Sequence, residues 1–241
     1  MSTCVLVHGA WHGAWCWYKL APRLERAGHA VCAPDLPAHG RDPTPATAVT
    51  FEDYVDRIES VVEERNEPVA LVGHSMGGAV VTQVAERYPE RIETLVYLTG
   101  FLLPDGIAPI DIVRTDEGSQ LSPAIETHRN GCRTIRDGAV ERVLYHDCDA
   151  ADVWLCQSLL RPEPPSSLTT PVETTSERFG SVPRVFVECR DDRAFSPAAQ
   201  AELRKELPCE TVFSLNAGHA PFFATPDALA ECLVSVMSVR R

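Results

Sequence analysis

The pentapeptide Gly73-His74-Ser75-Met76-Gly77 holds the residues of this sequence that are best placed to do chemistry. It lies between an apolar run, 69–72, and a helix-like run, 79–88, which is the strand, turn and helix context of a nucleophile elbow. A serine on so tight a turn brings its backbone close to its neighbours, which favours glycine two residues before and after it. The sequence therefore predicts that Ser75 Oγ stands above a sheet at a helix N-terminus, with the N–H of Met76 directed at a developing oxyanion.

A nucleophilic serine works with a histidine base and with a carboxylate that holds the histidine in the correct tautomer. Where such an elbow occurs, the acid and then the base follow the serine along the chain. His219 lies between the last expected strand and the last expected helix, so we expect it on a loop at the carboxyl edge of the sheet. Three carboxylates are candidates for the acid: the neighbours Asp191 and Asp192, and Asp105, which follows an earlier strand.

A second N–H donor for the oxyanion is expected in the loop after the first strand. The segment His8-Gly9-Ala10-Trp11 follows an apolar run directly. Gly9 has no side chain and lets the backbone come close to a substrate. The sequence therefore predicts an oxyanion hole made by the N–H groups of Ala10 and Met76.

The elements that must position these residues follow an alternating rhythm of short apolar runs and longer amphipathic segments. This rhythm predicts a mostly parallel, doubly wound α/β sheet covered by helices on both faces. The expected strands are 4–7, 30–33, 69–72, 95–98, 185–187 and 211–215, and the expected helices are 15–27, 54–64, 79–88, 198–207 and 228–237. Between about 101 and 180 the rhythm breaks into irregular, proline-rich pieces, which we interpret as a cap over the C-terminal edge of the sheet, where ligands bind in such folds. We expect a single domain over 1–241, with the core in 1–100 and 181–241.

Composition excludes several classes of function. The 241 residues suit one large domain, and a formal net charge of -12 argues against a nucleic-acid partner, which needs clustered lysine and arginine. The nine cysteines form an odd set without a C-x-x-C pair, which fits neither a disulfide framework nor a zinc site. Without a basic or long apolar leading segment, and without a run of about 20 apolar residues, the sequence predicts a cytoplasmic protein that does not bind membranes.

Several motifs resemble one known family. They are residues 8–15, 35–40, the elbow, 145–148, 160–162 and 188–194, and they look like the α/β-hydrolase superfamily, in the group of plant methyl esterases, hydroxynitrile lyases and related bacterial carboxylesterases. The resemblance covers nearly the whole chain and implies an α/β-hydrolase fold with a helical cap inserted after the sixth strand. In that group the acid is the aspartate just before Arg or Lys, with a proline a few residues on, which here is Asp192. The resemblance thus implies Ser75, Asp192 and His219 as a triad, with Ala10 and Met76 as oxyanion donors.

Two positions separate the activities within this group. The best-known hydroxynitrile lyases carry Thr where this sequence has Gly9 and Lys where it has Ala220, so neither of these residues for cyanohydrin cleavage is present. We therefore expect a serine hydrolase that cleaves a small, largely apolar carboxylic ester or lactone without metal or organic cofactor. A non-hydrolytic lyase or cyclase and a ligand-binding receptor on the same fold are the alternatives, and a homodimer is compatible with the sequence. Apolar side chains outside the expected site that could line a pocket, but that we expect in ordinary packing, are Phe101, Leu102, Leu103, Trp154, Phe195, Phe222 and Phe223.

Overall fold

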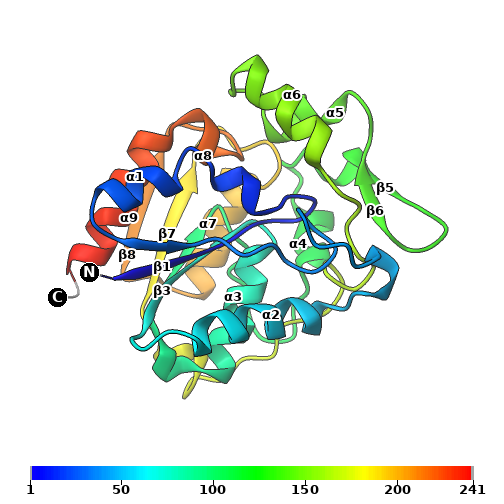
Figure 1. Ribbon diagram of the computed structural model, residues 1–241. Helices are drawn as coiled ribbons and strands as arrows, with labels where there is room; N and C mark the ends of the chain where they lie inside the picture. Colours follow the sequence, from blue (N-terminus) through cyan, green and yellow to red (C-terminus); the bar gives the residue numbers. More distant parts are fainter. Residues whose placement is uncertain (1, 240–241) are drawn as a thin grey trace.

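Six parallel strands form the central sheet of the computed structural model, which describes residues 2–239 (Figure 1). They are β1 (Thr3–Val7), β2 (Ala30–Cys32), β3 (Val69–His74), β4 (Ile92–Leu98), β7 (Arg184–Cys189) and β8 (Thr211–Leu215), in the spatial order β2-β1-β3-β4-β7-β8. Every neighbouring pair in this sheet runs parallel. The central strand β3 is buried along its whole length, as expected for an apolar strand with helices on both faces.

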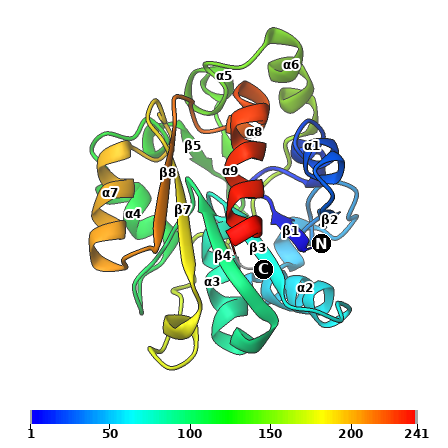
Figure 2. The same ribbon diagram turned by 90° about the vertical axis from the view of Figure 1, so that its left-hand side faces the viewer.

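The helices divide between the two faces of the sheet (Figures 1 and 2). Helices α1 (Ala21–Arg26) and α9 (Pro226–Val239) pack together on one face, and α2 (Phe51–Glu63) and α3 (Gly77–Arg87) pack together on the other. Helix α7 (Pro197–Glu206) packs against β7, and the short α8 (Pro221–Ala224) precedes α9. The predicted fold class, a doubly wound parallel α/β sheet, is therefore confirmed. Short 3-10 helices lie at η1 (Ala14–Trp17), η2 (Ala46–Ala48), η3 (Pro89–Arg91), η4 (Ser122–Ala124) and η5 (Phe179–Ser181).

One expected helix is wrong. We expected a continuous helix over 15–27, but the structure has the 3-10 helix η1 followed by a separate α1. Pro22 lies in the first turn of α1. Proline has no N–H to continue a preceding helix, whereas it is well tolerated in a first turn, so the segment restarts there.

Part of the segment between β4 and β7 lies at one end of the sheet, where α5, α6, β5 and β6 form a cap (Figure 1). Its elements are α4 (Pro109–Thr115), β5 (Ile125–Thr127), β6 (Arg133–Ile135), α5 (Ala139–Leu144) and α6 (Ala150–Leu159). The cap is not purely helical, because β5 and β6 pair as an antiparallel hairpin. It also follows the fourth strand of the main sheet and not the sixth, because within residues 2–239 the sheet starts at β1 and no strand precedes it.

Two further observations concern the chain as a whole. All nine cysteines lie within the described residues, and each is a free thiol. Among residues 2–239, no helix combines the length and the apolar character that crossing a membrane would require.

Candidate active site

Ser75 lies on the turn between β3 and α3 in a left-handed backbone conformation, with φ 51°. Such a conformation is strained for a residue with a side chain. The flanking glycines make the turn sterically possible: a Cβ on Gly73 would lie 2.5 Å from the Gly77 carbonyl oxygen, and a Cβ on Gly77 would lie 2.7 Å from the Val7 carbonyl oxygen. Both positions therefore exclude larger residues, as the sequence predicts.

His219 and Asp192 are brought together from the loops after β8 and β7. His219 Nδ1 lies 2.7 Å from Asp192 Oδ2, and both side chains are buried. Because a carboxylate only accepts, Nδ1 carries the proton of the neutral ring, and Nε2 is left as a base. Asp192 is itself fixed by a hydroxyl and two backbone groups: Thr99 Oγ1 donates at 2.5 Å, Ala194 N–H at 2.7 Å and Phe195 N–H at 2.9 Å.

His74 links the histidine loop to the elbow. Its Nε2–H donates to the His219 carbonyl oxygen at 2.8 Å, and the two rings lie 4.8 Å apart between centroids. Complete burial, helped by the neighbouring rings of His219 and His12, holds the pKa of His74 well below its usual value. The residue before Ser75 is therefore a neutral donor that ties the loop of His219 to the elbow.

The other two carboxylates lie elsewhere. Asp191 and Asp105 are both exposed, and Asp105 accepts the Thr174 N–H at 2.8 Å. Sequence reasoning missed Thr99, which donates to Asp192 and also has a positive φ, 36°. Its only sequence signal is its place at the end of β4, next to the strand that carries the acid.

The backbone of Ala10 lies beside the elbow. A Cβ on Gly9 would lie 2.9 Å from both Ser75 Cβ and His74 Nδ1, so the space at Gly9 is taken by the elbow and is not open. Ala10 and Met76 are buried, and within residues 2–239 neither N–H is donated to another protein group. Buried N–H groups are normally paired, so two unused donors beside a serine are suited to hold a substrate oxyanion.

Two buried histidines hold this loop, and sequence reasoning gave neither a role. His8 Nδ1–H donates to the Gly9 carbonyl oxygen at 2.9 Å, and His12 Nδ1–H donates to the Ala10 carbonyl oxygen at 2.7 Å. Burial lowers the pKa of His8 to about 3 and that of His12 to about 4, so both rings are neutral near pH 7. Each then accepts at Nε2, His8 from the Leu36 N–H at 3.1 Å and His12 from the Tyr145 hydroxyl at 2.6 Å.

Comparison with known proteins identifies the family. A model of the alpha/beta hydrolase family matches residues 4–232. The chain belongs to this family. It is similar to methylesterase 1 of Arabidopsis thaliana, at 31% identity over 96% of this chain and 94% of the relative, and to norfluorocurarine synthase 2 of Strychnos nux-vomica, at 32% identity over 96% of this chain and 94% of the relative. The crystal structure of polyneuridine aldehyde esterase superposes with a TM-score of 0.89 at 28% identity, covering 98% of this chain and 99% of that one. The expected family and its plant methyl esterase group are thus confirmed.

Apolar side chains surround the site of this alpha/beta hydrolase. The Phe101 N–H donates to the Ser75 carbonyl oxygen at 3.0 Å, and the Phe101 ring lies 5.0 Å from the Phe195 ring. The Phe222 ring lies 4.9 Å from the His74 ring. Leu102, Leu103 and Phe223 are also buried. Trp154 is different: it lies on α6 with 71% of its surface exposed, so the expectation that it packs or lines a pocket is wrong.

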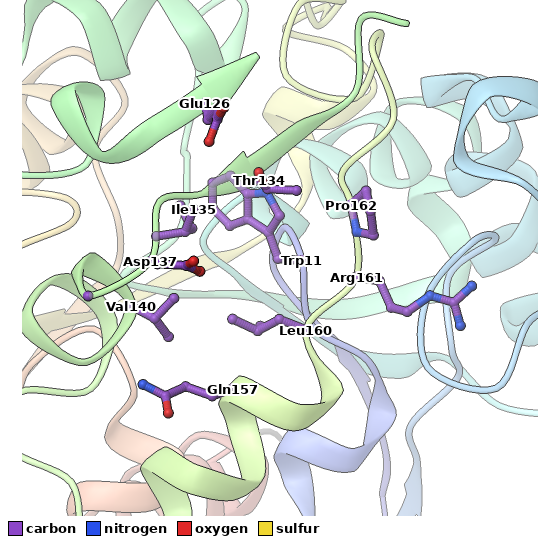
Figure 3. Close-up of a pocket in the computed structure, with 11 residues that line it drawn as sticks. Trp11, Glu126, Thr134, Ile135, Asp137, Val140, Gln157, Leu160, Arg161 and Pro162 are labelled. Carbon is purple, nitrogen blue, oxygen red and sulfur yellow. The ribbon is translucent and has the colours of Figure 1, made fainter. Parts of the chain in front are cut away.

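A cavity of about 640 Å³ lies within the cap, and its walls are partly apolar and partly charged (Figure 3). Trp11, the residue after Ala10, lies in the middle of the lining and connects the cavity to the loop of the oxyanion donors. Ser75, Asp192 and His219 are not among the lining residues. These are Trp11, Glu126, Thr134, Ile135, Asp137, Gly138, Val140, Gln157, Leu160, Arg161 and Pro162.

Proposed function

We propose that this protein, a carboxylesterase-type hydrolase by its family, cleaves a small, largely apolar carboxylic ester or lactone through an acyl-enzyme on Ser75. The observation that carries the proposal is the 2.7 Å contact between His219 Nδ1 and Asp192 Oδ2, beside a serine on a strained strand-to-helix turn. The buried rings of Phe101, Phe195 and Phe222 support an apolar substrate. The nine free thiols support a reducing compartment such as the cytoplasm.

In the acylation step, Ser75 Oγ forms a bond to the ester carbonyl carbon while its proton passes to His219 Nε2. The carbonyl electrons move onto the oxygen, which accepts the N–H groups of Ala10 and Met76. Asp192 stabilises the imidazolium that forms. When the tetrahedral intermediate collapses, the bond to the alcohol oxygen breaks and His219 Nε2–H gives the alcohol its proton.

In the deacylation step, water takes the place of the alcohol. His219 Nε2 removes a proton as the water oxygen forms a bond to the acyl carbon, and the same two N–H groups hold the oxyanion. The bond to Ser75 Oγ then breaks, and His219 returns the proton to the serine. The products are a carboxylic acid and the free enzyme.

The test is a panel of aryl, alkyl and methyl esters with lactones, assayed on the purified protein and on Ser75→Ala. We expect the unmodified protein to hydrolyse at least one small apolar ester, and Ser75→Ala to lose that activity. A fluorophosphonate probe should label the peptide that contains Ser75 in the unmodified protein only. Turnover that survives in Ser75→Ala, or labelling at another residue, contradicts the proposal. A pocket that binds esters but is not labelled and does not turn over points to a receptor.

A non-hydrolytic reaction at the same residues is the second candidate, because one relative is named a synthase. A lyase of the hydroxynitrile type is the form of it that Gly9 and Ala220 allow to be tested. Gly9 and Ala220 favour hydrolysis, since neither brings a hydroxyl or a cation to the triad. A threonine at position 9 would also require Ser75 or His74 to shift. We therefore expect no mandelonitrile cleavage by the unmodified protein. Mandelonitrile cleavage without activity on any ester overturns the proposal in favour of the lyase.

A further inference from the structure

Glu163 is a cap residue whose carboxylate is completely buried beside the loop of the oxyanion donors. Its Oε2 accepts the Trp11 N–H at 2.7 Å. Its backbone is tied to the cap hairpin, because Glu163 and Arg133 of β6 exchange two hydrogen bonds of 2.8 and 2.9 Å. The carboxylate therefore transmits the position of the cap to the residue that follows Ala10.

Trp11 is held by the cap through all of its polar groups. Besides the N–H bonded to Glu163, its carbonyl oxygen accepts the Arg161 N–H at 2.9 Å, and its indole N–H donates to the Arg133 carbonyl oxygen at 3.0 Å. Trp11 also has a left-handed backbone, with φ 65°. A tryptophan keeps such a conformation only where its surroundings impose it, and here the surroundings are three residues of the cap.

The hydrogen bond to Glu163 acts on a peptide group next to the expected oxyanion donor. The Ala10 carbonyl and the Trp11 N–H belong to one rigid peptide plane. His12 donates to its oxygen at 2.7 Å and Glu163 accepts from its nitrogen at 2.7 Å, so the plane is held from both sides. Because this plane begins at Ala10 Cα, its orientation limits where the Ala10 N–H can point.

Glu163 is kept charged in the interior by its neighbours. Burial alone would raise the pKa of its carboxyl, but His39 at 3.1 Å and the hydrogen bond from Trp11 lower the pKa to about 2. The Tyr54 hydroxyl donates to the other oxygen at 3.0 Å. Removing a carboxylate from water costs free energy, so a buried ion pair adds little net stability. We therefore look for the role of Glu163 in the peptide group that it orients.

We propose that Glu163 is a positioning residue of the oxyanion hole: by accepting the Trp11 N–H it holds Trp11 in its left-handed conformation and so directs the Ala10 N–H at the substrate oxyanion. This inference rests on the proposed function, because it assigns Glu163 a part in the ester hydrolysis at Ser75. It also gives the cap a part in catalysis, since a cap residue then fixes the loop that carries the Ala10 N–H.

The experiment compares Glu163→Ala with Asp152→Ala in kcat, KM and the inhibition constant of a boronic acid that forms a tetrahedral adduct with Ser75. Asp152 is a matched control: it is also a buried cap carboxylate bound to the core, but it contacts Lys19 and Tyr18 and not the loop of Trp11. Loss of a donor from an oxyanion hole lowers kcat by about 100-fold or more. We expect Glu163→Ala to lower kcat by about that factor and to raise the inhibition constant of the boronic acid by about the same factor. KM should change less than about threefold. Asp152→Ala should change all three by less than about threefold.

Two conservative variants keep the test decisive if Glu163→Ala does not fold. Glu163→Gln loses the charge but keeps an oxygen within reach of the Trp11 N–H, whereas Glu163→Asp keeps the charge but is one methylene shorter. If Glu163 acts by positioning Trp11, Glu163→Gln should keep a higher kcat than Glu163→Asp and should bind the boronic acid more tightly. The inference is overturned if Glu163→Asp keeps as much kcat and boronic-acid affinity as Glu163→Gln, or if Glu163→Ala changes KM alone. It is also overturned if Asp152→Ala loses as much kcat as Glu163→Ala. If the unmodified protein hydrolyses no ester, the proposed function has failed, which is a separate result.

Discussion

Three residues with strained backbones belong to the expected site or adjoin one of its members. Of the described residues other than glycine, Trp11, Ala38, Ser75 and Thr99 have positive φ. Ser75 is the expected nucleophile, Thr99 donates to Asp192, and Trp11 follows Ala10. Each such conformation costs on the order of 1–3 kcal/mol and persists where the surroundings over-determine it. Three of the four strained residues thus lie in the expected site or next to one of its members, and strain of this kind often clusters at functional sites.

The triad should act as a unit. We expect Ser75→Ala and His219→Ala each to remove nearly all esterase activity, and the double variant to be little worse than either one, because neither group can work without its partner. The measurement is kcat/KM for the best ester of the panel in all four proteins. Losses that multiply independently in the double variant would show that the two residues do not share one proton transfer.

The acid offers a comparison of two neighbours. Asp192→Asn should lower kcat by about 10⁴-fold, because an amide cannot hold His219 in the tautomer with the proton on Nδ1. Asp191→Asn is the matched control, since Asp191 is the adjacent residue and is exposed, and it should change kcat less than about threefold. A large loss of kcat in Asp191→Asn would show that Asp191, and not Asp192, is the acid.

Much of the site can be predicted from local sequence, and the rest cannot for a physical reason. The elbow glycines and the loop His8-Gly9-Ala10 can be recognised in the sequence, because backbone sterics require particular residue types at fixed spacing. Thr99 and Glu163 are distant in sequence from the groups they bond, and a threonine or glutamate is not unusual at either place. Their partners exist only in the folded chain, so no short pattern reports them.

Partly buried polar contacts attach the cap to the core. On the face near η1, Asp152 of α6 accepts Lys19 Nζ at 2.5 Å and the Tyr18 hydroxyl at 2.6 Å. Asp147 accepts the N–H of Gly218, the residue before His219, at 2.6 Å. The motif 145–148 that carries the family resemblance thus holds the histidine loop.

The Asp152 contact should contribute measurably to stability. Lys19→Met leaves the Asp152 carboxylate buried without its cation and should lower the free energy of unfolding by about 2 kcal/mol, with the remaining Tyr18 bond and partial exposure of Lys19 limiting the loss. Lys205→Met is the control: Lys205 and Glu202 also lie 2.6 Å apart, but both are exposed, so its loss should stay below about 0.5 kcal/mol. Urea unfolding of both variants checks this, and equal losses would contradict it.

Except for helix 15–27, the strands and helices of the core are predicted well, because they carry a continuous apolar run or an amphipathic pattern. Expected strand 211–215 coincides with β8, and the other strands agree with the structure within a few residues. The hairpin β5–β6 was not predicted, since β5 is largely exposed and neither strand carries a continuous apolar run or an alternating pattern. The cap elements depend on contacts with the core more than on their own sequence.

Six histidines are buried within the described residues, and three of them have a strongly lowered pKa. Burial lowers the pKa of His8 to about 3 and that of His12 to about 4, and holds that of His74 well below its usual value. The pKa of His39 shifts in the opposite direction. Burial alone would lower its pKa, but the Glu163 carboxylate raises it.

These rings predict how stability depends on pH. His8, His12 and His74 stay neutral in the folded protein but take up protons near pH 6.5 when it unfolds, so their contribution is present above pH 6.5 and is lost as the pH falls toward 4. His39 has the opposite sign, and its contribution is lost only as the pH rises above 6.5. Between pH 6 and 5 we expect the free energy of unfolding to fall by at least about 1.4 kcal/mol. This is the change per pH unit when unfolding adds one proton to a single histidine.

Urea unfolding at a series of pH values measures this slope. His128→Gln is the control, because His128 is exposed and its replacement should leave the slope unchanged. A free energy of unfolding that is flat between pH 6 and 5 would contradict the prediction.

The direct pairing of β4 with β7 has a consequence for how the chain reaches its structure. Leu98 lies opposite Val187, so the entire cap separates two neighbouring strands along the chain. Pairing residues so far apart in sequence is entropically costly, and such contacts form late in folding. We expect pulse-labelled hydrogen exchange to show that β1, β3 and β4 are protected before β7 and β8. Until β7 pairs with it, β4 is an exposed sheet edge at which chains can aggregate. The serine elbow would then be assembled on the ribosome well before the strands that deliver Asp192 and His219 have been made.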